Sequence, residues 1–140
     1  MKVCAKVTYE ISDRMQKDND RHIYLDNVKV NGVGPYTFIF DTGASVTCIS
    51  KEIARRHKIR SKSRKLSKGA YSSKRIGMGI VASVSVQKAI RRGIDVAILD
   101  LAELSKHLRC RIDGILGHSF LEKFVVTIDY PEQVVTLKRR

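Results

Sequence analysis

Alternating apolar and polar residues, many of them β-branched, run through most of the sequence and predict a mostly β protein. The predicted strands, in chain order, cover residues 2–11, 22–30, 36–40, 76–87, 94–99, 124–130 and 134–138. The last two are expected to form a hairpin around Pro131. No internal repeat or low-complexity linker interrupts the pattern, so we expect a single domain over residues 1–140.

Turn residues divide the second and third predicted strands. Asn31–Gly32 is a strong signal for a tight turn, and Gly34–Pro35 predicts a further break before the next strand. The run after it is apolar and aromatic, which favours a buried strand ending at Phe40. These residues are therefore expected to form a hairpin that delivers Asp41 at its end.

Two short helices and one loop complete the expected elements. Ser50 with Glu52 can open a short helix, because Ser is a good N-cap and an acidic residue suits the first turn. Ser119 and Glu122 have the spacing of a capping box for a second helix. Residues 60–73 are rich in Ser, Lys and Arg and are expected to form a loop.

The composition excludes several classes of protein. Hydrophobic residues make up 43% of the chain and charged residues 29%, as in a globular protein. No run approaches the roughly 18 apolar residues of a membrane-spanning helix, and charges interrupt the start where a signal peptide is apolar. The three cysteines, Cys4, Cys48 and Cys110, suit neither a disulfide framework nor paired zinc ligands. We therefore expect a cytoplasmic protein.

The net charge of +13 comes from one central part of the chain. Residues 53–94, the basic segment, hold thirteen Lys and Arg and no acidic residue, while the remainder balances at 14 against 14. Such a segment can neutralise phosphates or attract acidic polypeptides, and the alternative is a solvated loop. Aromatic residues that would stack on single-stranded nucleic acid are nearly missing, with Tyr71 alone nearby. The basic segment alone therefore does not identify a partner, and nucleic acid and acidic polypeptide both stay open.

Residues 38–45, with the sequence Phe-Ile-Phe-Asp-Thr-Gly-Ala-Ser, carry the clearest chemical signal. Asp41 ends a strongly apolar strand, where an ionised carboxylate costs several kcal/mol unless hydrogen bonds or water satisfy it. The Thr42 hydroxyl and the Gly43 amide are suitably placed to do so. A turn-capping Asp would have a similar sequence, so these residues alone leave both interpretations open.

A second motif points to one family. Residues 112–121 place two large apolar residues between Gly114 and Gly117, before a short connection into the final hairpin. Together with Asp41-Thr42-Gly43, this order resembles the retropepsin-like aspartic proteases over about residues 22–138. The resemblance implies a mostly β fold, a closed β-barrel with short helices, one domain per chain, and peptide hydrolysis by a homodimer.

The resemblance also implies a role for each residue of the first motif. Asp41 would be the catalytic carboxylate, and the Thr42 hydroxyl would hold the facing loop. Gly43 would allow that loop to approach the carboxylate closely. Ala44 stands where pepsin-like enzymes commonly carry Ser, which suggests activity nearer to neutral pH than in pepsins.

Members of the family cover the cleft with a mobile hairpin, the flap. Its tip, which would bind substrate, is expected at Gly69, Ala70 and Tyr71, with Gly77-Met78-Gly79 as the alternative. The spacing of Gly77 and Gly79 also imitates a dinucleotide-binding fingerprint, but β-branched residues follow where a helix should begin.

The resemblance implies no metal or other cofactor. The four histidines, His22, His57, His107 and His118, have no ligand spacing. His118 is also a departure from the retroviral enzymes, which place Arg directly after the equivalent of Gly117. The ion pair that this Arg supports in them is therefore in doubt here.

One Asp-Thr-Gly motif implies two chains, because the mechanism needs two carboxylates that share one proton. We expect an obligate homodimer in which both Asp41 residues meet at the two-fold axis, with the final hairpin, including Val134, Val135 and Leu137, forming much of the interface. The expected function is an aspartic endopeptidase that cleaves apolar polypeptide segments. The alternative is a non-catalytic module of the same fold that binds nucleic acid or acidic protein through its basic segment.

Overall fold

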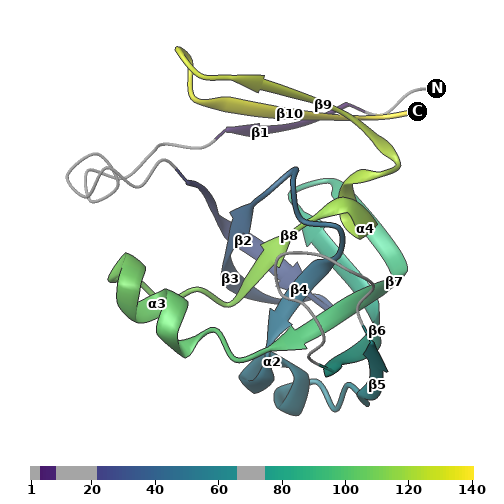
Figure 1. Cartoon of the computed structure of the whole chain (residues 1–140). Coiled ribbons are helices and arrows are strands. Elements are labelled where there is room, and N and C mark those ends of the chain that lie inside the picture. Colours follow the sequence, from purple (N-terminus) through teal and green to yellow (C-terminus); the bar gives the residue numbers. More distant parts are fainter. Residues whose placement is uncertain (1–3, 9–21, 66–74) are drawn as a thin grey trace.

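The computed structural model describes residues 4–8, 22–65 and 75–140, which form strands with a few short helices (Figure 1). The elements in chain order are β1 (Cys4–Thr8), β2 (Ile23–Val30), β3 (Val33–Phe40), β4 (Thr47–Ser50), α2 (Lys51–Arg56), β5 (Lys62–Lys65), β6 (Arg75–Val86), β7 (Ala89–Leu99), α3 (Ala102–Leu108), β8 (Gly114–Leu116), α4 (His118–Leu121), β9 (Phe124–Asp129) and β10 (Val134–Arg139). The prediction of a mostly β protein is confirmed.

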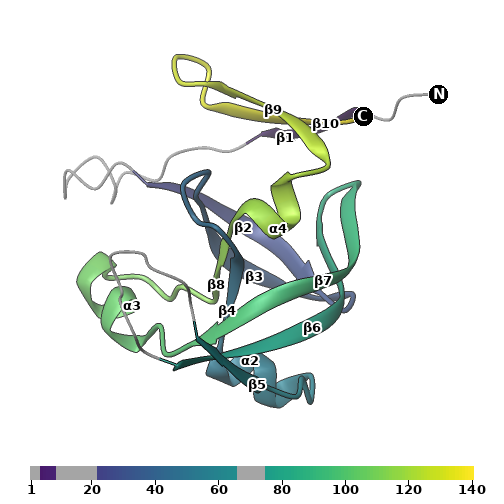
Figure 2. The same ribbon diagram turned by 45° about the vertical axis from the view of Figure 1, so that its right-hand side comes forward.

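Most of the strands form one closed sheet. Their order is β2-β3-β8-β4-β7-β6-β5, and β2 also pairs with β6, so the strands from β2 to β6 close into a barrel with β5 outside it. A separate sheet, β1-β10-β9, lies beyond one end of the barrel in both ribbon views (Figures 1 and 2). The expected closed β-barrel is therefore confirmed.

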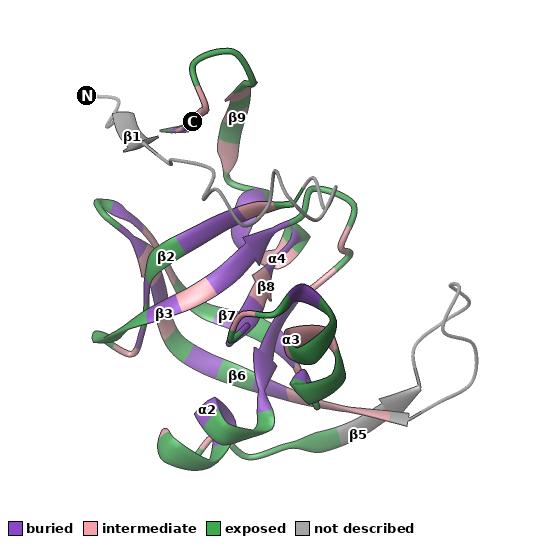
Figure 3. Cartoon of the chain, turned by 90° about the vertical axis from the view of Figure 1, so that its left-hand side faces the viewer, coloured by how far each residue is buried: buried purple, intermediate pink, exposed green. Residues whose placement is uncertain are grey.

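The barrel closes around β-branched side chains. Val28 pairs with Val86 and Val30 pairs with Val84, and all four side chains are fully buried. Buried and exposed residues alternate along much of the barrel (Figure 3), as expected for strands with one face on a core. The close packing of these stiff side chains, about 1.5–3 kcal/mol for each fully buried one, stabilises the closure.

The turn between β2 and β3 follows the sequence prediction. Asn31 and Gly32 have φ values of +50° and +75°, which Asn and Gly adopt most readily. The further break expected at Gly34–Pro35 is wrong, because β3 begins at Val33 and runs through both residues. A side chain at Gly34 would come within 2.7 Å of the Val28 carbonyl oxygen, so this glycine allows the two strands to approach closely.

Four further elements differ from the sequence prediction, and one of them, β4, has no counterpart among the predicted strands. Part of the expected loop over 60–73 is strand β5, which pairs with β6. Strand β7 begins at Ala89, and not at residue 94 as predicted, because a tight turn with Gln87 at φ +52° joins it directly to β6. Helix α3 has no counterpart among the predicted elements.

In the part of the chain that the structure describes, no helix has the length and apolarity to cross a membrane.

Helix α2 begins as predicted. The Ser50 hydroxyl accepts a hydrogen bond from the Ile53 amide at 3.2 Å, which caps the helix. At its other end, the Tyr36 hydroxyl lies 3.1 Å from His57 Nε2 and accepts a hydrogen bond from Arg56. Burial, and then the charge of Arg56, lower the pKa of His57, so its neutral ring can accept a hydrogen bond from the Tyr36 hydroxyl. These contacts fasten α2 to β3.

Candidate active site

Strand β8 lies between β3 and β4 and creates the position that Asp41 occupies. It runs parallel to β3 and antiparallel to β4, so the connection from β3 to β4 passes over its end. A side chain at Gly114 would come within 2.5 Å of both the Cys48 carbonyl oxygen and the Phe38 ring. Glycine is therefore required where β8 enters between its neighbours.

Asp41 follows β3 directly and is held by backbone groups. Its amide donates to the Leu116 carbonyl at 3.0 Å, and its carbonyl accepts from the Ala44 amide at 3.2 Å. The Gly43 amide donates to the carboxylate oxygen Oδ1 at 2.9 Å, as the sequence predicted. Asp41, Thr42 and Gly43 are exposed in the single chain. The carboxylate is thus oriented from within the chain and remains accessible.

Thr47 ties the other side of this loop to the end of β8. Its side chain is fully buried, and its hydroxyl accepts from the Gly117 amide at 3.1 Å and lies 3.4 Å from the Gly117 carbonyl. The His118 amide donates to the Ala44 carbonyl at 2.8 Å. A side chain at Gly117 would come within 2.7 Å of the Val46 carbonyl oxygen. The second glycine of the motif is therefore needed for this contact.

Ser119 has a tertiary role in place of the expected capping role. Helix α4 begins at His118 with Gly117 at its N-cap and no side-chain capping bond, so the predicted capping box is wrong. The Ser119 hydroxyl accepts from the Thr47 amide at 2.9 Å and donates to the Asp95 carbonyl at 2.9 Å. It therefore links α4 to β4 and β7.

Arg91 fixes the same helix from strand β7. Its guanidinium donates to the carbonyl oxygens of Ser119 at 3.1 Å and Phe120 at 2.9 Å, and it also pairs with Glu122 at 3.5 Å. His118, at the position of the retroviral Arg, is exposed and lies 3.4 Å from Glu122. Sequence reasoning missed Arg91, Thr47 and the tertiary role of Ser119, because no local motif marks them.

Asp113 differs from Asp41 because both of its oxygens are engaged inside the chain. Oδ2 accepts from the Thr37 amide at 3.0 Å and Oδ1 pairs with Arg111 at 2.9 Å. The side chain is buried at 6% exposure. Asp113 therefore has a structural role, and Asp41 is the accessible carboxylate of the two.

Cys48 lies within electrostatic reach of Asp41. Burial raises the pKa of the Cys48 thiol to about 11, and the negative charge of Asp41 contributes to this shift in the same direction. The thiol is therefore protonated at neutral pH and is a poor nucleophile. Among the described residues there is also no group of three or more His, Cys, Asp or Glu side chains that could hold a metal ion.

The hairpin of β5 and β6 lies where the flap was expected. Lys62 pairs with Met78 and Lys65 with Arg75, so the connection consists of residues 66–74. The predicted tip residues Gly69, Ala70 and Tyr71 belong to this connection and lie outside the described residues.

The alternative tip is wrong, because Gly77, Met78 and Gly79 lie within β6 and pair with β7 on its other side. A side chain at Gly79 would come within 2.7 Å of Ile59 Cγ2 and 3.0 Å of the Arg60 carbonyl oxygen. This glycine therefore allows the segment before β5 to pack on β6, which also explains why it is not part of a nucleotide-binding loop.

The barrel with its inserted strand, and the Asp-Thr-Gly loop at its rim, form a retropepsin-like fold. The sequence model of the family described as aspartyl protease matches residues 27–120, which include both motifs. The chain therefore belongs to the aspartyl protease family.

The fold has a close counterpart among solved structures. A retropepsin-like aspartic protease from Rickettsia conorii is 22% identical, with a TM-score of 0.69 over 99% of this chain and 94% of that chain. The EIAV protease in complex with the inhibitor HBY-793 is 18% identical, with a TM-score of 0.49 over 83% of this chain and 92% of that chain. No curated protein matches the sequence significantly.

Proposed function

We propose that the protein is an aspartic endopeptidase that acts as a homodimer, with water activated between two Asp41 carboxylates. The observation that carries this proposal is the exposed Asp41 carboxylate, held by the Gly43 amide at the rim of a retropepsin-like barrel. One carboxylate would take a proton from water while the other, protonated, polarises the scissile carbonyl. A single chain supplies one of the two.

The exposed loop supports assembly through the two-fold axis. Asp41, Thr42 and Gly43 are consecutive exposed residues that directly follow the buried end of β3, residues 38–40. Two such loops facing each other would bring the carboxylates together and exclude bulk water from them. In this arrangement the Thr42 hydroxyl holds the partner's loop, and Gly43 leaves room for it.

The final hairpin offers a different set of interface residues from the one expected. Val135 and Leu137 are buried within the single chain, at 2% and 0% exposure, and are not available to a partner. Val125 and Tyr130 are exposed at 44% and 67%. We therefore assign the dimer contact of this hairpin to these two residues, because exposed large apolar side chains favour association.

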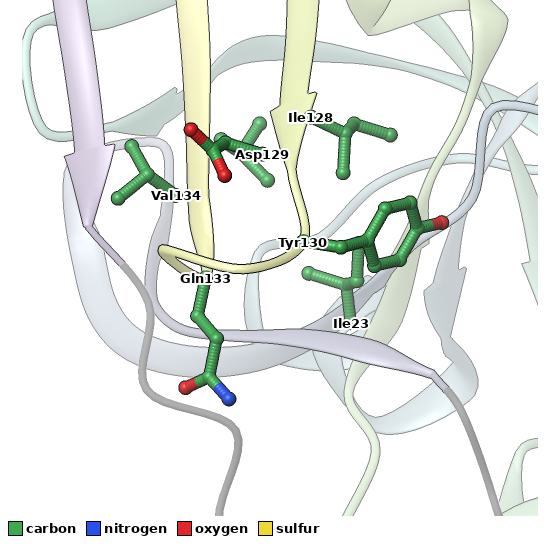
Figure 4. A pocket seen from close by; sticks show the side chains of 7 residues that line it. Ile23, Ile128, Asp129, Tyr130, Gln133 and Val134 are labelled. Carbon is green, nitrogen blue, oxygen red and sulfur yellow. The ribbon is translucent and has the colours of Figure 1, made fainter.

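The pocket beneath this hairpin is not a substrate site. Ile23, Ile128 and Tyr130 contribute to its lining (Figure 4), and its volume of about 20 Å³ is close to that of one water molecule. None of the Asp-Thr-Gly residues lines it.

Strand register brings four apolar residues into one row on one face of the sheet. Cys48 pairs with Ile115 on one side and Ala97 on the other, and Ile115 pairs with Ile39. Directly paired residues point to the same face of a sheet, so these four form one row, the apolar strip. Ile39, Cys48 and Ala97 are buried within the single chain and Ile115 is half-buried, so the strip packs inside the chain and the apolar substrate stays a prediction. The cytoplasmic location and the nucleic-acid partner stay predictions.

Replacing Asp41 by Asn tests the catalytic assignment. Asp41→Asn should lower cleavage of a peptide library by at least about 10²–10⁴-fold, because the amide cannot accept the proton from water. Asp26→Asn, at an exposed position on β2, is the matched control and should cleave normally. Thermal unfolding of all three proteins verifies the fold. Equal turnover by Asp41→Asn would refute the proposal, and a folded wild-type dimer that cleaves nothing would favour the non-catalytic alternative.

A further inference from the structure

An open groove with a basic rim lies between α2 and the barrel, apart from the candidate active site. Its volume is about 540 Å³, and Lys51, Arg55, Lys58 and Arg60 line its rim. All four side chains are exposed. We call it the α2 groove.

The floor of the α2 groove is apolar. It consists of Ala54, which is buried, and of Ile59 and Ile98, which are half-buried. Ile59 packs on Gly79 of β6, where a larger residue would displace it. The groove therefore combines a built apolar surface with surrounding positive charge, which a solvated basic loop would not provide.

The rim charges have no acidic partner among the described residues. The three ion pairs among the described residues involve Arg91, Arg111 and His118, none of which lines the groove. Glu52 is the closest carboxylate in sequence and does not line the groove. Arg55 lies in the last turn of α2, where a positive charge also stabilises the helix end. Lys58 and Arg60 lie beyond the helix, so this stabilising role does not explain their charges.

We propose that the α2 groove docks an acidic segment of a polypeptide substrate, outside the segment that is cleaved. That the docked polypeptide is a substrate rests on the proposed protease function. That an acidic peptide binds here rests on the groove alone. Carboxylates complement the rim, and interspersed apolar side chains suit the floor. Nucleic acid fits less well, because the described residues that line the groove include no aromatic ring to stack on its bases.

The α2 groove adjoins a second groove on the barrel surface. Ile98 follows Ala97 in β7, so its side chain points to the opposite face from the apolar strip. Arg60 lines both the α2 groove and a neighbouring groove of about 230 Å³ that includes Met78 and Asp95. Met78 pairs with Ala97 of the strip. Arg60 therefore joins the two grooves, so a polypeptide bound in the α2 groove has a path past Arg60 into the second groove.

Binding to the full-length Asp41→Asn protein tests the groove without cleavage. The probe is a fluorescent peptide of about 12 residues with alternating Glu and Leu, and its control carries Gln in place of Glu. We expect the acidic peptide to bind at least about tenfold more tightly, with affinity falling as salt rises from about 0.05 M to about 0.5 M. Equal binding of the two peptides would overturn the proposal.

Two double variants separate the groove from the overall charge. Arg55→Gln with Lys58→Gln should weaken binding of the acidic peptide by about three- to tenfold, since each exposed ion pair contributes little. Lys88→Gln with Arg92→Gln removes the same charge at exposed positions outside the groove and should keep the affinity. An equal loss in both double variants would show that net charge, and not the groove, binds the peptide.

The remaining outcomes separate this proposal from the protease assignment. In the wild-type background, an acidic extension on a cleavable peptide should raise kcat/KM, and the groove variant should remove that gain while cleaving the unextended peptide normally. If no peptide is cleaved but acidic peptide still binds in the groove, the protease function fails and the acidic-peptide site stands. Tighter binding of single-stranded RNA, weakened by the groove variant alone, would overturn the choice of polypeptide.

Discussion

At the scale of single residues, the candidate site depends on hydrogen bonds that hold its loop from behind. Thr47 is the central example, because its buried hydroxyl serves the Gly117 amide and its own amide donates to Ser119. None of these groups needs to touch substrate. They position the backbone on both sides of Asp41, which the proposed mechanism requires to stay in place.

Replacing Thr47 by Val tests this support. Thr47→Val keeps the shape but leaves the buried Gly117 amide without its acceptor, so the free energy of unfolding should fall by about 1–3 kcal/mol. Thr47→Ser keeps the hydroxyl and should lose less. Urea unfolding at one fixed protein concentration measures both, since dimer formation makes stability depend on concentration. A Val variant as stable as the wild type would show that the hydroxyl contributes nothing net.

At the scale of elements, close approach between segments explains glycines that look like motif residues. Gly77 and Gly79 lie in a strand against residues 59–61, and this contact also builds the floor of the α2 groove. The pattern therefore serves packing of a connection on a strand. It does not serve a phosphate-binding turn.

Gly79→Ala tests this packing. Glycine in an open strand position is destabilising, so alanine would normally stabilise β6 by about 0.5–1 kcal/mol. At Gly79 the added methyl meets Ile59 and the Arg60 carbonyl, and we expect a loss of about 1–3 kcal/mol, measured by urea unfolding.

A double-mutant cycle checks the cause of that loss. Ile59→Ala removes the methyl group that the new side chain of Gly79→Ala would meet, so the double variant should lose less than the sum of the single variants. Additive losses would mean that the contact with Ile59 is not what limits position 79.

At the scale of the whole molecule, charge should oppose assembly. Two chains at +13 would bring +26 into one dimer, from 2 × 13, and the excess lies in the basic segment, which includes the β5–β6 hairpin. Salt screens such repulsion over roughly 8 Å at physiological ionic strength, against about 30 Å in very dilute buffer. The affinity of the α2 groove for acidic peptide should change in the opposite direction and fall as salt rises.

We therefore expect dimerisation and cleavage to strengthen as salt rises from about 0.01 M toward 1 M, and more strongly with sulfate. Sedimentation velocity and cleavage rates across the same salt series measure both. A dimer that weakens or stays constant with salt would show that the basic segment points away from the interface.

The sequence by itself determined the features whose signals are local. The Asn31–Gly32 turn, the Ser50 cap of α2 and the apolar strand before Asp41 each depend on residues within a few positions of one another. The two glycines around Ile115 and Leu116 could be recognised as a motif in the same way. These signals were sufficient for a mostly β protein, and the resemblance that the two motifs carry added the closed barrel and the candidate carboxylate.

Only the tertiary structure decided the roles that depend on distant partners. Ser119 has a capping sequence, but its hydroxyl bonds to groups 72 and 24 residues away, and the helix begins before it, at His118. Strand β5 has the composition of a loop and becomes a strand because β6 offers it an unpaired edge. In both cases the free energy of a long-range hydrogen bond outweighs local preference, and no short stretch of sequence contains both partners.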